Sequence, residues 1–131
     1  MRGPIPPTWA PYVQGVLRIV CAFLYMAHGS QKLLGYPPAE SAPPMSALFV
    51  VAGVLELGGG LLLLLGFWTR PVAFLLSGQM AAAYFMAHFP QGFWPLQNKG
   101  ELAVVYCFVF LYVATQGSGS WSLDRALGRK S

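Results

Sequence analysis

The sequence predicts an all-α membrane protein, a four-transmembrane-helix up-down bundle with a short C-terminal amphipathic tail. The first reason is composition: hydrophobic residues make up 56% of the 131 residues and charged residues only 9%, whereas soluble domains hold about 45–50% and about 25%. The second is that four stretches have roughly the 20 apolar residues that a helix needs to cross the hydrocarbon. We expect a single membrane domain over residues 1–131.

The four expected spans differ in how apolar they are. The second, with five consecutive leucines, and the fourth, with AVVYCFVFLYVAT, are the clearest. The first contains three basic or imidazole side chains, but its length and the entry residues Trp9 and Tyr12 favour a helix that spans. The spans are expected at about residues 12–34, 45–66, 70–89 and 100–116.

The connections between the expected spans are short, so consecutive helices should be antiparallel neighbours. They read GYPPAESAPP, FWT and PQGFWPLQNK. The tail, residues 117–131, begins with glycine turns and then contains the amphipathic SLDRAL, which we expect at the membrane surface.

The charge pattern predicts which side of the membrane each loop faces. The net charge is +4, but the basic residues stand singly between apolar runs, so they flank spans and do not line a nucleic-acid groove. Five basic residues share one side with both termini, and two lie on the other; under the positive-inside rule both termini are cytoplasmic. The two sets are Arg2, Arg70, Arg125, Arg129 and Lys130 against Lys32 and Lys99. No signal-peptide cleavage pattern follows the N-terminus, so the chain should keep its first helix.

The first span has one polar face. Spacings of 4, 3, 4, 3 and 4 align Gln14, Arg18, Cys21, Tyr25, His28 and Lys32. A charged residue in the middle of a lipid-facing helix costs about 2.5–3.5 kcal/mol, so this face should point into the bundle or into a wet cavity. Alternatively, Arg18 and Lys32 extend to the two membrane surfaces.

Glu56 is the ionisable residue of the second span and lies near its middle, among glycines that let helices approach closely. It needs a partner or a proton, or it serves only to lock one helix to another. At about 1.5 Å per residue, His28 lies about 9 Å deep, Glu56 about 16 Å and Arg18 about 24 Å from the outer ends of their helices. Side chains lean toward the N-terminus of their helix, which favours His28 as the neighbour of Glu56 and lets Arg18 meet Asp124.

The last two spans add polar groups near the outer side. Tyr84 and His88 share a face of the third span, and Glu101 opens the fourth. For His88 and Glu101 the alternative is solvation at the interface or a helix cap, since a helix N-terminus favours a carboxylate. The paired Glu-x-x-His pattern of di-metal bundles is missing, and Cys21 and Cys107 form no CxxC, so no metal site is expected.

In its ordered motifs the chain resembles the DoxX family of small four-helix membrane proteins. The motifs are RIVCAFLYMAHGSQKLLG at 18–35, GVLELGGGLLLLLGFWTRP at 53–71, HFPQGFWPLQNKGELAVVY at 88–106 and GSGSWSLD at 117–124. The resemblance implies a protein of the cytoplasmic (inner) membrane that is an oxidoreductase component. It also implies links to thiosulfate and quinone redox chemistry, to quinone or catechol stress, and to complexes with a sulfurtransferase and a superoxide dismutase.

The resemblance also implies which positions matter. The residues at family-pattern positions are Arg18, Gly29, Lys32, Glu56, His88, Gly92, Glu101 and Asp124. The chain has no flavin, nicotinamide or haem-attachment motif, so a redox cofactor would be a diffusible quinone or would belong to a partner.

The expected function is therefore that of a subunit of a membrane redox complex, with an outward-facing polar pocket for a quinone or a small sulfur compound. His28 and Glu56 would relay protons. His88 and Glu101 would gate or polarise the ligand, with Tyr84 beside them, and Arg18 and Lys32 would hold negative charge. Partners would be the lipid bilayer and either further copies of the chain or redox proteins.

Two other functions fit the same residues. A non-catalytic scaffold or assembly factor would use the buried polar groups only to fix helix packing. A small-solute transporter would use them as a midplane site, although four short helices leave little room for alternating access without oligomerisation.

Overall fold

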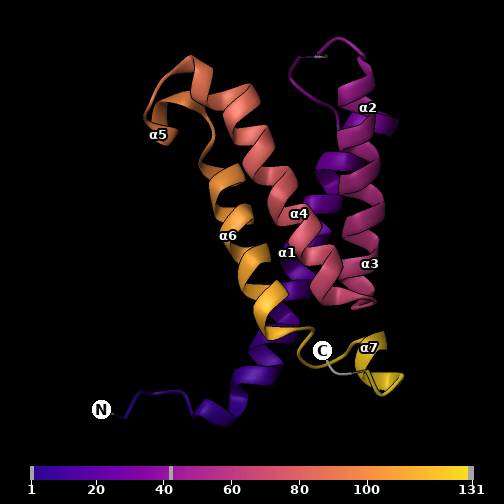
Figure 1. Ribbon diagram of the computed structural model, residues 1–131, viewed down its shortest axis with the longest axis vertical. Helices are drawn as coiled ribbons and strands as arrows, with labels where there is room; N and C mark the ends of the chain where they lie inside the picture. Colours follow the sequence, from indigo (N-terminus) through magenta and orange to yellow (C-terminus); the bar gives the residue numbers. More distant parts are fainter. Residues whose placement is uncertain (1, 42, 130–131) are drawn as a thin grey trace.

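The computed structural model describes residues 2–41 and 43–129, and its regular elements are all helical, as predicted (Figure 1). Short 3₁₀ or π-helical pieces are labelled η. In order the elements are η1 Pro7–Trp9, α1 Ala10–Leu34, α2 Ala47–Val54, η2 Leu55–Gly59, α3 Gly60–Leu65, α4 Thr69–Ala83, η3 Tyr84–His88, η4 Phe89–Gln91, α5 Pro95–Asn98, α6 Glu101–Gln116 and α7 Leu123–Ala126.

The first rod is η1 followed by α1. Prolines stand in the first turns of both, where a missing N–H removes no helical hydrogen bond. The rod ends at Gly35, which adopts the left-handed conformation at φ 69°. The 25 residues of α1 extend about 37 Å, more than the hydrocarbon thickness of about 30 Å.

Two further rods are each interrupted by a π-helical turn. In the second rod, α2 and α3 flank η2, and the hydroxyl of Ser46 caps α2 by accepting the Phe49 N–H at 3.2 Å. In the third rod, α4 continues through η3 into η4. Single π turns inside α-helices are frequent at functional sites, and both of these turns contain residues predicted for the site.

The described residues contain three helical stretches long and apolar enough to cross a membrane: Pro7–Leu34, Ala47–Leu65 and Thr69–Gln91. The expected fourth helix exists as α6, but its 16 residues extend only about 24 Å. The helix is confirmed, whereas a count of four full spans is not.

The rods pack in two pairs, α1 along α2, η2 and α3, and α4 along α6 (Figure 1). Small residues permit the close contact in the first pair: a Cβ added to Gly29 would lie 2.5 Å from the amide nitrogen of Leu57, and one on Gly60 would lie 2.5 Å from Met26. The buried hydrophobic core is contributed by both pairs. It consists of Ala22, Tyr25, Leu63, Ala73, Leu76, Met80, Ala103, Tyr106, Phe110 and Val113.

The two ends of the bundle differ. Both termini and α7 lie at one end, and the two longer loops lie at the other (Figure 1). The tail folds back onto its end, because Gln14 donates a hydrogen bond to the Gly117 carbonyl at 2.6 Å and the Ser120 amide donates to the Pro11 carbonyl at 3.0 Å. The predicted SLDRAL helix is present as α7. Lys130, which entered the charge comparison, lies outside the described residues, as does the end of the tail.

Candidate ligand-binding cavity

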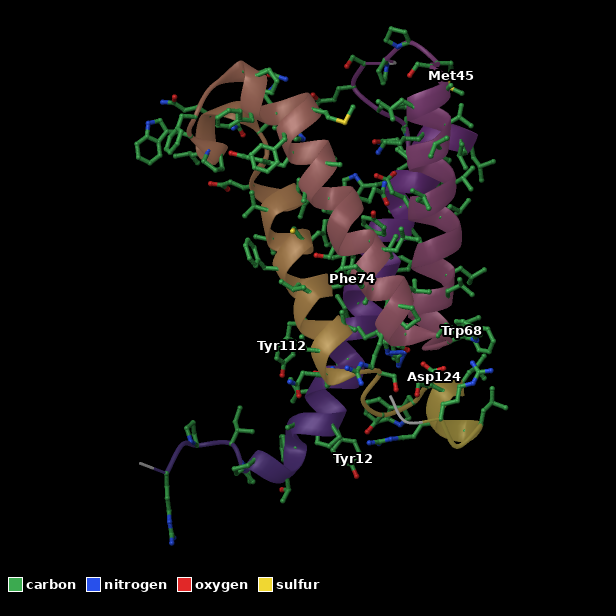
Figure 2. All side chains as sticks on the ribbon, in the orientation of Figure 1. Tyr12, Met45, Trp68, Phe74, Tyr112 and Asp124 are labelled. Carbon is green, nitrogen blue, oxygen red and sulfur yellow. The ribbon has the colours of Figure 1, made fainter. Side chains whose placement is uncertain are left out.

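A cavity of about 870 Å³ lies between the two helix pairs, within the range of about 300–1,000 Å³ typical of ligand sites. Its walls are mainly apolar and come from α1, α2, η2, α4, η3 and α6. Ser46 lines it and stands next to Met45, which Figure 2 places at the end of the bundle opposite to Tyr12 and Asp124. The polar side chains that line it are Tyr25, His28, Lys32, Ser46, Glu56, Gln79, His88, Lys99 and Tyr106.

An ion pair between Lys32 and Glu56 lies on the cavity wall. The Lys32 ammonium is 2.9 Å from Oε2 of Glu56 and donates a hydrogen bond to Oε1 at 3.1 Å. Glu56 is only 4% exposed. The ammonium carries three donors, so both carboxylate oxygens lie within its reach.

The position of Glu56 follows from its local backbone. It is the second residue of η2, and α1 runs against this turn because Gly29 has no side chain. A Cβ at Gly29 would be 2.9 Å from the Glu56 Cβ and 2.5 Å from the Leu57 amide nitrogen. The glycine therefore brings the polar face of α1 close enough for Lys32 to reach the carboxylate.

A second polar contact joins three helices beside this ion pair. The buried Tyr25 hydroxyl of α1 donates to Oε1 of Gln79 on α4 at 2.5 Å, and Nε2 of Gln79 donates to the Ala52 carbonyl of α2 at 3.4 Å. The Tyr25 ring also meets Phe110 edge-on, with ring centroids 4.9 Å apart. These contacts fix the floor of the cavity across both helix pairs.

His28 lines the cavity and is half-buried, but no hydrogen bond joins its ring to another described residue. Its nearest aromatic neighbour is Tyr106, at a centroid separation of 6.2 Å. The expected pairing of His28 with Glu56 is replaced by the pairing of Lys32 with Glu56. Lys32 lies one turn farther out, but its long side chain leans back along α1 and delivers the ammonium to the depth of Glu56.

His88 and Tyr84 belong to the other π-helical turn, η3. Nδ1 of His88 lies 3.0 Å from the Asn98 carbonyl, and the Tyr84 hydroxyl accepts a hydrogen bond from Asn98 at 3.3 Å. His88 lines the cavity, whereas Tyr84 and the exposed Glu101 lie outside its lining. The structure therefore brings together four of the predicted site residues, namely His28, Lys32, Glu56 and His88.

Arg18 lies away from this cavity, in contact with the tail. It is fully buried, and its five N–H groups donate to five backbone carbonyls at 2.8–3.3 Å. The acceptors are Leu63, Leu64, Ser118, Ser120 and Trp121. With all its donors used, the guanidinium has none left for a ligand. The geometry is that of a clamp that holds the tail to the bundle.

Asp124 completes the same end of the molecule as the cap of α4. Its carboxylate accepts the amides of Trp68 and Thr69, each at 2.9 Å, and lies 3.5 Å from Arg129. Burial by itself would raise the pKa of this carboxyl, but the bonds from Thr69 and Trp68 and the contact with Arg129 together lower it. The expected contact of Arg18 with Asp124 is replaced by two separate sets of hydrogen bonds. Arg18 donates to backbone carbonyls of the tail, and Asp124 of the tail accepts backbone amides at the start of α4.

Two residues of the site were missed from the sequence. Gln79 is the one amide side chain in the third expected span, which was a usable signal. Asn98 is buried and bonds to Tyr84, to the Gly92 carbonyl and to the Gly100 amide, but it ends the short helix α5 in a connection whose path the sequence does not define. Within the described residues no three His, Cys, Asp or Glu side chains gather as metal ligands.

Comparison with known proteins identifies relatives along nearly the whole chain. The DoxX family model matches residues 13–89. An "uncharacterized protein" of Haemophilus influenzae is 40% identical over 128 residues, covering 93% of this chain and 96% of the relative. The inner membrane protein YqjF of Escherichia coli is 32% identical over 88% of this chain and 92% of its own length. The inner membrane protein YphA of the same organism is 26% identical, over 88% and 90%. No solved structure matches the chain.

Proposed function

Since the chain belongs to the DoxX family, we propose that it is a subunit of a redox complex in the inner membrane and that its cavity binds a quinone. The observation that supports this most is the combination of an apolar cavity of about 870 Å³ with an ion pair on its wall between the half-buried Lys32 and the buried Glu56. A quinone, when bound, supplies two-electron redox chemistry, and the chain supplies the binding site.

The chemistry of the walls favours a quinone over a small sulfur anion. Lys32 is already neutralised by Glu56 at 2.9 Å, so the inner part of the cavity has no spare positive charge. An anion that left water for these apolar walls would lose its hydration without a partner. An uncharged ring with polar substituents buries its apolar faces and exposes only those substituents to Lys32, His28 and Gln79.

The cavity is also placed to receive a ligand from the bilayer. Phe74 and Leu75 of α4 and Leu48 and Val51 of α2 line it, and all four side chains are exposed on the outside of the described bundle. Such exposed apolar side chains on membrane helices face the lipid tails. The route between α2 and α4 is therefore the path that suits a lipid-soluble ligand.

The polar residues of the cavity have different roles according to their position. His28 and Glu56 are the groups beside the cavity that hold or move a proton, as buried imidazole and carboxyl groups do in membrane relays. His88 and Lys99 line the outer part of the cavity, where they meet a ligand first. Under the positive-inside rule, Arg2, Arg70, Arg125 and Arg129 at the end of the two termini favour cytoplasmic termini, and the cavity would then face outward.

The scaffold alternative is favoured by one observation, the use of Arg18. A fully buried cation at the tail serves packing alone, through bonds to backbone carbonyls. If Lys32 and Glu56 have the same role, the cavity is filled by lipid tails and binds nothing specific.

The test is native mass spectrometry of the purified protein in nanodiscs with ubiquinone-1, supplied both oxidised and dithionite-reduced. Gly78 lines the cavity and has open space where a Cβ would stand, so Gly78→Leu should fill the cavity without a clash. Gly58→Leu is the matched control, since Gly58 is equally open but lies outside the cavity. We expect one ligand per chain in wild type and in Gly58→Leu, and loss of the ligand in Gly78→Leu.

Two results would contradict the proposal. Wild type that binds neither redox form would refute it and favour the scaffold. Equal binding by Gly78→Leu, with the helical circular dichroism of wild type, would place the ligand outside this cavity.

A further inference from the structure

We propose that the connection between η3 and α6 lies in the membrane, at the boundary between lipid headgroups and acyl chains. This connection, the 89–98 loop, contains η4 and α5. At that depth the loop anchors its end of the bundle in the bilayer, whatever ligand the cavity binds. Three observations point to this position: the lengths of the neighbouring helices, the side chains that the loop exposes, and the hydrogen bonds of its backbone.

The two helices that the loop joins differ in length. The stretch Thr69–Gln91 has 23 residues and extends about 34 Å, whereas the 16 residues of α6 extend about 24 Å. The two helices are level at the tail end, where Nε of Arg70 donates to the Ala114 carbonyl at 2.9 Å. At the other end α6 therefore begins about 10 Å below Gln91, and the loop turns back along the helices to reach it (Figure 1). With a hydrocarbon thickness of about 30 Å, this descending part lies at the depth of the lipid boundary.

The loop exposes an apolar surface without charge. Its four large apolar side chains, Phe89, Phe93, Trp94 and Leu96, are 44–78% exposed. The aromatic rings form a row that starts at Phe85 of η3, with centroids of successive rings 5.2–6.5 Å apart. No Asp, Glu, Lys or Arg occurs between Phe85 and Asn98.

This surface continues that of a helix long and apolar enough to cross the membrane. Phe85 and Met86, which are 62% and 60% exposed, belong to the stretch Thr69–Gln91. In water the loop would enlarge an exposed apolar patch, whereas at the membrane interface aromatic rings are the preferred side chains. The occupant that suits this surface is therefore lipid.

The loop also satisfies backbone groups from within, as irregular chain at membrane depth has to do. Asn98 is only 1% exposed; its Nδ2 donates to the Gly92 carbonyl at 2.9 Å, and its Oδ1 accepts the Gly100 amide at 2.8 Å. The Gly92 amide donates to the Phe89 carbonyl at 3.1 Å, and the Asn98 amide donates to the Trp94 carbonyl at 2.9 Å. Asn98 thus ties the two ends of the loop together without water.

The charged residues that follow the loop fit the same depth. Lys99 and Glu101 are both exposed, and long side chains of this kind extend to the headgroups while their backbone stays deeper. Lys99 and His88 also line the cavity, on either side of the loop. A loop at the lipid boundary therefore places this part of the cavity at the level of the headgroups.

The experiment measures the depth of Trp94 by fluorescence quenching in nanodiscs. The variant keeps this tryptophan alone, with Trp9, Trp68 and Trp121 replaced by phenylalanine. The quenchers are phosphatidylcholine brominated near the carbonyl end of its acyl chains, the same lipid brominated near the methyl end, and acrylamide in the water. We expect the first to remove at least about half of the Trp94 emission and the other two to remove far less, because tryptophan settles at the membrane interface.

The matched control places a single tryptophan in the other long connection at the same end. It combines Glu40→Trp with replacement of all four native tryptophans by phenylalanine, since Glu40 is exposed between α1 and α2. We expect acrylamide to quench this tryptophan and the brominated lipids to leave it bright. If the multiple variants fail to fold, the difference in quenching between wild type and Trp94→Phe reports on the same residue.

A second variant tests whether Asn98 holds the loop at this depth. In Asn98→Ala, made with Trp94 as the single tryptophan, the Gly92 carbonyl and the Gly100 amide lose their partners and need water. We expect quenching by the carbonyl-end brominated lipid to fall at least about twofold and quenching by acrylamide to rise. Gln97→Ala is the matched control, because it removes an exposed amide next to Asn98, and it should leave Trp94 in place.

Three results would contradict the proposal. Acrylamide quenching of Trp94 as strong as that of the Glu40→Trp control would place the loop in water. Weak quenching by all three agents would place it against a second copy of the chain or another protein. Unchanged quenching of Trp94 in folded Asn98→Ala would refute the role given to Asn98.

Discussion

Replacing Arg18 by leucine should release the tail from the bundle. Three of its five bonds, at 3.0, 3.1 and 2.8 Å, hold the carbonyls of Ser118, Ser120 and Trp121. An orphaned buried carbonyl costs about 1–3 kcal/mol, so three would cost about 3–9 kcal/mol if the tail stayed in place. A released tail exposes these carbonyls to water again, so the cost lies at the low end of this range. We therefore expect the docked tail to be less stable by about 3 kcal/mol.

The assay for this change is limited trypsin digestion of the purified protein, followed at the tail residues Arg125 and Arg129. When cleavage follows local opening, weakening the docking of the tail by about 3 kcal/mol makes cleavage about a hundredfold faster. The fluorescence of Trp121 should also change, since its ring lies 5.6 Å from Tyr12 only while the tail is docked.

The matched control is Arg70→Leu, which removes the same charge from the same end of the molecule. Arg70 is exposed and donates one bond, to the Ala114 carbonyl at 2.9 Å. Losing this hydrogen bond should lower the free energy of unfolding by about 1 kcal/mol or less. Tail cleavage in Arg18→Leu at the wild-type rate, with an unchanged unfolding midpoint in dodecyl sulfate, would refute the clamp.

Two further predictions concern Asp124 in the tail and Gly29 at the contact of α1 with η2. The lowered pKa of Asp124 means that its stabilising effect is complete above the unfolded pKa of about 3.9 and is lost as the pH falls through the lower folded value. The difference in unfolding midpoint between wild type and Asp124→Asn should therefore be constant from pH 5 to 7 and shrink below about pH 4; a constant difference down to pH 2 would contradict this assignment. Gly29→Ala places a Cβ 2.5 Å from the Leu57 amide nitrogen, so it should destabilise the fold by about 1–3 kcal/mol, measured by unfolding in dodecyl sulfate. Gly58→Ala, with nothing within 4 Å, should leave stability unchanged or slightly higher, and equal midpoints for the two glycine variants would show that α1 and η2 do not need this contact.

The helices could be predicted well because hydrophobic length decides them. The first expected span, 12–34, compares with α1 at Ala10–Leu34, and the last, 100–116, with α6 at Glu101–Gln116. A fourth span was expected because the apolar run AVVYCFVFLYVA is nearly unbroken. The expected span, 100–116, was itself short, and the 16 residues of α6 leave the helix short of the hydrocarbon thickness.

The partners of the polar residues were harder to predict, for physical reasons. The polar face of α1 was evident from its spacing, yet which member reaches Glu56 depends on side-chain length, and Lys32 reaches farther than His28. The acceptors of Arg18 are backbone carbonyls, which every residue carries, so no sequence pattern marks them. The π turn that holds Glu56 likewise leaves no distinct signature in LELGG.

The most direct measurement of the central claim is photolabelling of the nanodisc-embedded protein with an azido-quinone, reduced or oxidised, followed by mapping of the labelled peptides. The cavity predicts label on α2 and η2, between Leu48 and Glu56, and on α4, between Phe74 and Gln79. Excess ubiquinol-1 should remove this label. Label confined to the exposed face of α6 around Phe108, or label that excess ubiquinol-1 does not remove, would contradict quinone binding in this cavity.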